Sequence, residues 1–336
     1  MSDRTTHLLQ LINQFAGKRV LVLGDVMLDE YLKGSVDRVS PEAPVPVVSL
    51  KSRESKPGGA ANVALNITAL GAEAILIGLI GNDDAGDALA EALSLNGIDA
   101  KYLVKSSSRR TTRKARVMSQ GQQLLRVDTE DAQAPSDAER SELLQQVKTC
   151  LQVGKIDVIL FQDYDKGVLD EALIFSVTKL AQESSIPTVV DPKARNLWFY
   201  RGVTLFKPNL KEVSAALPSL VINQGDVASL KVAHQALQKL LKHEQSLITL
   251  GSGGAFLAFE DESHELLAAH PRRIADVCGA GDSVVAVAAL ALANDAPPKD
   301  LLELSNLAGG LTCEFVGVHP IGTADLIRGV EELKPG

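Results

Sequence analysis

The sequence predicts a doubly wound α/β fold, in which a mostly parallel sheet carries helices on both faces and a small β lid is attached. Hydrophobic residues occupy 45% of the 336 positions, enough to bury a substantial core. Aromatic residues make up only 4%. A core rich in Ala, Val, Ile, Leu and Gly suits helices packed closely on buried parallel strands. Strand-like and helix-like segments also alternate through the second half, which is typical of βαβ units.

In the first half, apolar positions recur at helical spacing in some segments, while others are short β-branched runs bounded by glycine. These patterns predict helices at residues 8–15, 60–70 and 85–95, and strands at 19–23 and 74–80. Residues 29–50 hold several prolines and lack helical periodicity, and residues 112–128 alternate like a hairpin. We expect these last two segments to form the β lid.

In the second half the same criteria give a longer alternation. Strands are expected at 156–161, 188–190, 204–207 and 246–250, helices at 171–183, 210–217 and 227–241, a hairpin at 254–267 and a helix from about 279. A further pair of helices ends the chain. Neither a repeat nor a low-complexity linker interrupts the sequence, so residues 1–336 are expected to be one domain with the lid inserted in it.

Charge and cysteine content exclude several classes of protein. Lys and Arg total 34 against 42 Asp and Glu, and a net charge of −8 disfavours binding to nucleic acid. The three cysteines are far apart and form no CxxC pair, which argues against a disulfide framework or a zinc site and fits the cytoplasm. The longest apolar stretch, residues 284–293, is too short to span a membrane, and we find no targeting signal.

The segment from Asp276 to Ser283 carries the strongest chemical signal. Gly279, Ala280 and Gly281 precede a small-residue helix, so their backbone amides can approach an anion at the helix N-terminus. Asp282, in the same turn, could accept the proton of a hydroxyl that attacks a γ-phosphate. The alternative is a glycine-rich turn with Asp282 capping the helix, and spacing alone does not separate the two.

Several separated motifs then resemble the ribokinase/PfkB family of carbohydrate kinases along nearly the whole chain, in the order in which that family has them. Gly24-Asp25 is similar to the end of the family's first strand, Pro57-Gly-Gly-Ala-Ala-Asn62 to its N-terminal glycine signature, and Gly279-Ala-Gly-Asp282 to its C-terminal signature. The resemblance implies a ribokinase-like fold, ATP as phosphoryl donor and Asp282 as catalytic base. It also implies that sugar hydroxyls are held by Asp25, Asp29, Gly58, Gly59 and Asn62.

The same resemblance implies a nucleotide site. Asn209 and Glu212 match the family's Asn-x-x-Glu element, which organises Mg²⁺ and phosphate through water; a helix capping box is the alternative. Thr249, Gly251 and Gly254 resemble the nucleotide loop. Asn306 falls where the family places a residue beside adenine, although it could be an ordinary amide on a helix surface. Asp276 matches a position associated with a monovalent cation such as K⁺ in many relatives, although Cys278 stands where they usually carry Thr.

The lid sequence suggests which sugar is the acceptor. Ser40-Pro-Glu-Ala-Pro-Val-Pro46 and the run from Gln122 to Asp128 resemble the bacterial D-glycero-D-manno-heptose 7-phosphate kinases. This implies phosphorylation of O1 of a heptose 7-phosphate for ADP-heptose and the lipopolysaccharide core. Arg116, Lys166 and Lys193 are the expected contacts of the sugar phosphate. A PfkB kinase for another sugar, or a noncatalytic sugar-binding protein, remains the alternative. Exposed lid edges predict a homodimer through the lid.

Overall fold

The computed structural model describes residues 3–270 and 272–333. Its main sheet has nine strands in the order β13-β12-β11-β10-β9-β8-β1-β4-β5. The seven strands from β11 to β5 are parallel, and β12 and β13 extend the sheet antiparallel at one edge. The strands are β1 Arg19–Gly24, β4 Glu73–Gly81, β5 Leu103–Ser106, β8 Val158–Gln162, β9 Thr188–Asp191, β10 Leu205–Phe206, β11 Gln245–Thr249, β12 Ala255–Phe259 and β13 His264–Leu267.

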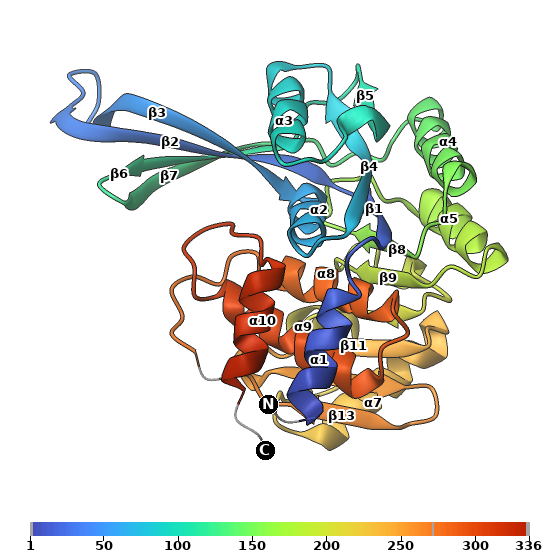
Figure 1. Ribbon diagram of the computed structural model, residues 1–336. Helices are drawn as coiled ribbons and strands as arrows, with labels where there is room; N and C mark the ends of the chain where they lie inside the picture. Colours follow the sequence, from blue (N-terminus) through green and yellow to red (C-terminus); the bar gives the residue numbers. More distant parts are fainter. Residues whose placement is uncertain (1–2, 271, 334–336) are drawn as a thin grey trace.

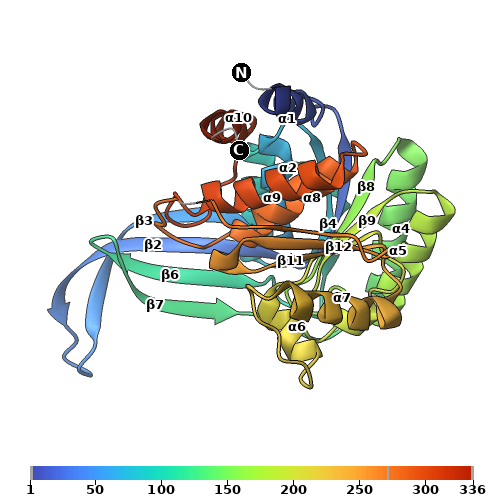
Figure 2. The same cartoon turned by 90° about the horizontal axis from the view of Figure 1, so that it is seen from below.

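Helices cover both faces of this sheet (Figures 1 and 2). β1 shows why, because Val20 and Val22 belong to one apolar cluster and Leu21 and Leu23 to the other, so its side chains alternate between two cores. One face carries α1 Asp3–Asn13, α2 Ala60–Ala69, α3 Asp84–Leu95, α8 Ala280–Leu292, α9 Pro298–Thr312 and α10 Thr323–Glu332. The other carries α4 Asp137–Val153, α5 Glu171–Glu183, α6 Leu210–Ala216 and α7 Val227–Leu241.

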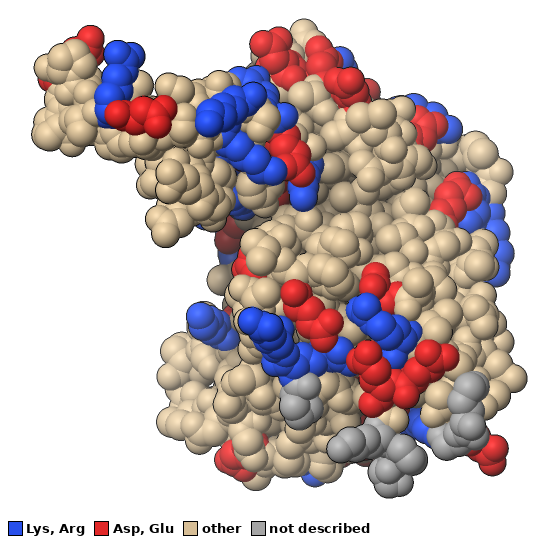
Figure 3. Space-filling model, turned by 60° about the vertical axis from the view of Figure 1, so that its left-hand side comes forward, with Lys and Arg blue, Asp and Glu red and all other residues tan. Residues whose placement is uncertain are grey.

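A second sheet projects from the body (Figure 1). Its four strands are β2 Val26–Val39, β3 Pro46–Gly59, β6 Arg113–Ser119 and β7 Gln122–Thr129, in the order β3-β2-β6-β7. The expected β lid is therefore present and comes from two separate segments. It is longer than expected, since β2 starts directly after Asp25 and β3 continues to Gly59, where α2 begins. Figure 3 shows the surface hollowed between this sheet and the body, with basic side chains where the two meet.

The structure also corrects the expected element list. Helix α4 and strand β5 were both missing from it. Over the described ranges, no helix is both long enough and apolar enough to cross a bilayer.

Candidate active site

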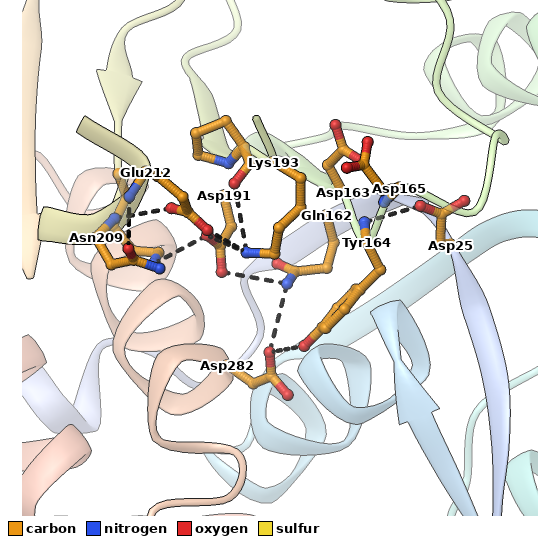
Figure 4. A network of polar contacts seen from close by, with 12 residues as sticks. Asp25, Gln162, Asp163, Tyr164, Asp165, Asp191, Lys193, Asn209, Glu212 and Asp282 are labelled. Carbon is orange, nitrogen blue, oxygen red and sulfur yellow. Dashed lines mark hydrogen bonds and ion pairs between the residues drawn. The ribbon is translucent and has the colours of Figure 1, made fainter. Parts of the chain in front are cut away.

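The carboxylate of Asp282 lies in the first turn of α8, at the carboxyl ends of the parallel strands, where open α/β sheets bind their ligands. Its side chain is buried and accepts hydrogen bonds from the hydroxyl of Tyr164 at 2.5 Å and from Nε2 of Gln162 at 3.4 Å (Figure 4). A third comes from Nδ2 of Asn62 at 2.6 Å. Burial raises the pKa of Asp282 to about 6, while the bonds from Tyr164 and Asn62 oppose that rise. Asp282 is therefore ionised at neutral pH and weakly basic.

The turn that precedes Asp282 has the backbone of an anion cradle. Gly279 has a φ of 80°, in the left-handed region that favours glycine. A Cβ added to Gly281 would meet no described atom within 4 Å, so the space in front of this turn is open. As far as the structure describes the chain, no side chain caps the N-terminus of α8. The backbone N–H of Ala280 makes only a long 3.4 Å bond to the oxygen of Val277, so this turn can still direct N–H groups towards a phosphate.

The glycine pair Gly58-Gly59 lets the end of β3 lie against the start of β2. A Cβ on Gly58 would overlap the carboxylate of Asp29, and a Cβ on Gly59 would overlap the backbone oxygen of Asp25. Asp29 in turn forms a 2.5 Å ion pair with Arg116 of β6, and both side chains are largely buried. Asn62 follows in α2, and among the described residues its Oδ1 has no hydrogen-bond partner although it is buried. Asp29, Arg116 and Asn62 therefore present polar atoms between lid and body.

Asn209 and Glu212 form the capping box that the sequence left open as an alternative. The Asn209 side chain accepts from the Glu212 amide at 2.9 Å, and Glu212 accepts from the Asn209 amide at 2.8 Å. Glu212 has a second contact, because Nζ of Lys193 lies 2.6 Å from its Oε1. The capping box therefore involves only one oxygen of this carboxylate, and the other contacts Lys193, just after the end of β9.

Comparison with known proteins identifies the family. A family model described as "pfkB family carbohydrate kinase" matches residues 18–321. The chain belongs to the PfkB family. It is a carbohydrate kinase, an enzyme that transfers a phosphoryl group to a sugar hydroxyl.

The curated relatives are longer than this chain. "Bifunctional protein HldE" of Caulobacter vibrioides is 42% identical over 327 residues, which cover 97% of this chain and 65% of that protein. The protein of the same name from Pseudomonas aeruginosa is 41% identical over 312 residues, 93% of this chain and 63% of its own length. The kinase therefore spans just under two thirds of these relatives.

Solved structures confirm the ribokinase-like fold. Escherichia coli phosphofructokinase-2, solved in complex with potassium, superposes with a TM-score of 0.75 at 21% identity, over 94% of this chain and 98% of that one. Arabidopsis thaliana ribokinase, solved with ribose and ATP, gives 0.70 at 19% identity, over 94% and 99%. At these identities the likeness establishes the fold.

Asp25, expected to hold a sugar hydroxyl, has another role in the kinase. Its oxygens accept the backbone N–H groups of Tyr164 at 2.8 Å, Lys166 at 3.1 Å and Val168 at 3.0 Å, and the side chain is buried. Burial raises the pKa of Asp25 and these three bonds lower it. Asp25 therefore fixes the loop that carries Tyr164, while its expected contact with a sugar hydroxyl stays a prediction.

The other basic residues expected at the sugar phosphate already have partners. Lys166 lies 2.9 Å from Glu130, and Lys193 binds Glu212 on the Asn209 side of the site. Arg116 is also paired, but its partner, Asp29 in the lid, is itself one of the expected acceptor residues.

The expected nucleotide residues lie together along the body. Thr249 forms an isolated parallel bridge with Asn209, and Gly251 and Gly254 have positive φ values of 59° and 91° in the turn after β11. Asn306 is mostly buried and donates to the backbone oxygen of Ala268 at 2.9 Å. The surface-amide alternative for Asn306 is therefore wrong, and contact with adenine stays a prediction.

Asp276 joins two loops of the kinase. Its oxygens accept the N–H of Cys278 at 3.1 Å and of Gly317 at 2.9 Å. In the described chain, no group of three or more His, Cys, Asp or Glu residues could hold a metal ion. A monovalent cation at Asp276 remains a prediction.

Sequence reasoning assigned no role to four polar residues of this site. Gln162 and Asp191 end β8 and β9, Tyr164 lies just beyond β8, and Lys207 follows β10. Lys207 lies 3.1 Å from Asp191, and both side chains are buried. Their position at the carboxyl ends of three neighbouring parallel strands was a usable signal, because such ends meet at one edge of a sheet.

Proposed function

We propose that this kinase transfers the γ-phosphoryl group of MgATP to O1 of D-glycero-β-D-manno-heptose 7-phosphate. The observation that carries the reaction type is the buried Asp282 carboxylate at the uncapped start of α8. It is held by donors from α2 and from the end of β8, and its pKa of about 6 suits a general base at neutral pH. The choice of sugar rests on the lid motif and on the 42% identity to a protein named HldE.

In this mechanism Asp282 takes the proton of O1 as that oxygen attacks the γ-phosphorus. The new O1–P bond forms while the bond from phosphorus to the bridging oxygen breaks, and ADP leaves with the electron pair. The amides before Asp282 bind the charge that spreads over the transferring group. Asn62 and Asp29 would orient the acceptor, since Oδ1 of Asn62, which has no partner among residues 3–270 and 272–333, could accept from a hydroxyl.

The residues present fit Mg²⁺ as a partner of the donor phosphates. Mg²⁺ keeps several waters and uses one or two carboxylates together with substrate phosphates, so it needs no all-protein cluster. Glu212, whose Oε1 lies 2.6 Å from Nζ of Lys193, would hold it through water, with Asn209 beside it. Bound there, Mg²⁺ would neutralise the charge of the donor phosphates.

We assign the 7-phosphate of the acceptor to Arg116. The guanidinium lies 5.2 Å from the ring centroid of Tyr31 and pairs with Asp29, so it is already oriented at the base of the lid. Lys193 lies beside Glu212, so we place it near the donor phosphates of ATP rather than at the 7-phosphate of the sugar.

The decisive experiment is an acceptor panel in which ADP release is measured with heptose 7-phosphate, fructose 6-phosphate and ribose. The proposal expects kcat/KM to be highest for heptose 7-phosphate. Arg116→Met should lose that preference by raising KM for the phosphorylated sugar, and Arg126→Met, which removes an exposed arginine of the same lid, should keep it. A preference for fructose 6-phosphate or ribose would instead favour the alternative of a PfkB kinase for another sugar.

We further propose a cytoplasmic homodimer that pairs through the lid. Apolar side chains are exposed along its strands: Val39 at 65%, Leu50 at 53% and Leu125 at 57%. Burying such a row against a second copy would remove it from water. Sedimentation velocity should show a dimer, and Leu125→Lys should shift it towards monomer; a monomeric wild type at micromolar concentration would contradict the proposal.

A further inference from the structure

Gln162 bridges two carboxylates inside the site. It is the last residue of β8 and its side chain is fully buried. The Nε2 group lies 3.4 Å from Oδ1 of Asp282 and 3.3 Å from Oδ2 of Asp191, so its two hydrogens serve two acids (Figure 4). Its Oε1 is buried and, within the described chain, has no partner. Burying an amide oxygen without a hydrogen-bond partner costs free energy. We infer that the two N–H contacts determine the orientation of this side chain and outweigh that cost.

The second acid, Asp191, is tied to buried positive charge. Oδ1 of Asp191 lies 3.1 Å from Nζ of Lys207 and 3.8 Å from Nζ of Lys193. Lys207 is itself buried, so the Asp191–Lys207 pair is poorly screened by water. A neutral amide is well suited to the space between Asp191 and Asp282, since it donates to both without adding charge.

We propose that Gln162 is a positioning residue, which keeps Asp282 ionised and oriented and couples it to the Asp191–Lys207 pair. The expected effect of Gln162 on catalysis rests on the function proposed above. Its expected effect on the charge of Asp282 rests on the contacts described here.

Other groups that face Asp282 determine how much the removal of Gln162 should change its ionisation. Tyr164 donates to the same oxygen as Gln162, and Asn62 donates to the other one. Asp191 opposes ionisation of Asp282, and Lys207 favours it. Each oxygen would still keep one donor without Gln162. The loss of Gln162 should therefore leave the fold intact and shift Asp282 moderately.

The test compares wild type with Gln162→Leu, which keeps the shape and removes both donors, and with Gln162→Glu, which adds a third acid. The control is Gln182→Leu, since Gln182 of α5 also donates through its amide, to the backbone oxygen of Gly202 at 3.0 Å, outside this network. Aspartate labelled with ¹³C at Cγ is titrated by NMR in protein without ligands. The Asp282 signal is assigned by its loss in Asp282→Asn.

In Gln162→Leu we expect the Asp282 midpoint to rise by about 0.5 unit or more, because the ionised form loses a donor. Gln162→Glu should raise it further, and Gln182→Leu should leave it unchanged. In the kinase assay the acidic limb of the kcat profile should move with these midpoints. At pH 7, Gln162→Leu should lower kcat about tenfold, with KM for ATP unchanged.

An unchanged Asp282 midpoint in Gln162→Leu overturns the inference, whichever sugar is the substrate. Equal midpoints in the two Gln162 variants would show that a charge at position 162 does not act on Asp282, and would also overturn the inference. If the midpoints move as expected but no acceptor in the panel is phosphorylated, the inference stands and the proposed function fails.

Discussion

Tyr164 donates a 2.5 Å hydrogen bond from its hydroxyl to Oδ1 of Asp282, although 118 positions separate the two residues. The contact depends on Asp25, which binds the backbone of the loop that carries Tyr164. A strand end, a loop and a helix start are thereby held in one arrangement. The proposed base is thus oriented before a substrate arrives, and orientation of this kind accounts for a large part of enzymatic rate.

Tyr164→Phe should therefore lower kcat about tenfold to a hundredfold and leave KM for ATP nearly unchanged. The Tyr164 bond lowers the pKa of Asp282, so its loss should raise that pKa further above about 6 and move the acidic limb of the rate profile to higher pH. The matched control is Tyr200→Phe, since the Tyr200 hydroxyl also donates to a buried carboxylate, Asp163, at 2.9 Å. An acidic limb that moves equally in both variants would refute a specific role for Tyr164.

Asp282→Asn should abolish turnover and yet stabilise the protein at neutral pH. General base catalysis contributes about 10²- to 10⁴-fold, so kcat should fall by at least a hundredfold. The folded pKa of Asp282, about 6, lies above its ordinary value of 3.8. The folded state therefore binds this proton more tightly than the unfolded chain, and the stability that results is present at low pH and lost as pH rises through 6.

Asp282→Asn cannot bind or release this proton, so its stability lacks the dependence on pH that Asp282 causes. The difference in the free energy of unfolding, variant minus wild type, should therefore increase by about 1 kcal/mol between pH 5 and pH 7.5. Urea denaturation at the two pH values measures that difference. A constant difference would show that Asp282 has the same pKa in the folded and unfolded chains.

Gly58→Ala should weaken acceptor binding through the lid. The added Cβ would overlap the carboxylate of Asp29, which must then shift together with its partner Arg116. KM for the sugar should rise about tenfold or more, with a smaller change for ATP. Gly225→Ala is the control, because its Cβ would meet no described atom within 4 Å and should change neither constant. Equal KM values for sugar in the two variants would remove Asp29 from the acceptor site.

The sequence predicts the alternating β and α order well because buried parallel strands and amphipathic helices carry strong periodic signals. Helix α4 escaped because a single apolar stripe of Leu143, Val147 and Cys150 is buried on an otherwise polar segment. Its start was nevertheless marked, since Ser136 and Glu139 form a capping box. Local start signals of this kind deserve weight even where hydrophobicity is weak.

The position of Asp282 in the site could be predicted, because a glycine-rich turn before a helix is a local feature and places the residues that follow it in the first helical turn. Its partners Gln162 and Tyr164 were not, since their contacts with Asp282 depend on how strand β8 and helix α8 come together. The backbone contacts of Asp25 have the same origin, because they depend on where the loop after β8 lies, and its expected contact with a sugar hydroxyl stays a prediction.

Two buried histidines limit the stability of the kinase in acid. His243 and His234 both contact the hydroxyl of Ser246, at 2.6 and 2.9 Å. Burial, with a smaller effect of His234, lowers the pKa of His243 to about 3, and burial also lowers the pKa of His234. Below pH 6.5 the two histidines bind protons more readily in the unfolded chain than in the folded state. The free energy of unfolding therefore decreases as pH falls from 6.5 towards 3.

His243→Gln should therefore flatten the acid side of the stability curve. Asp163 and Asp282, whose folded pKa values lie near 6, act in the opposite direction, so the comparison is between variant and wild type rather than within one protein. Between pH 7.5 and pH 5, wild type should lose about 1–2 kcal/mol more than the variant in urea denaturation. The variant would start from a lower value at pH 7.5, because the side chain packs 5.2 Å from Phe206 between ring centroids. Parallel curves for the two proteins would show that His243 is already free to bind a proton in the folded state.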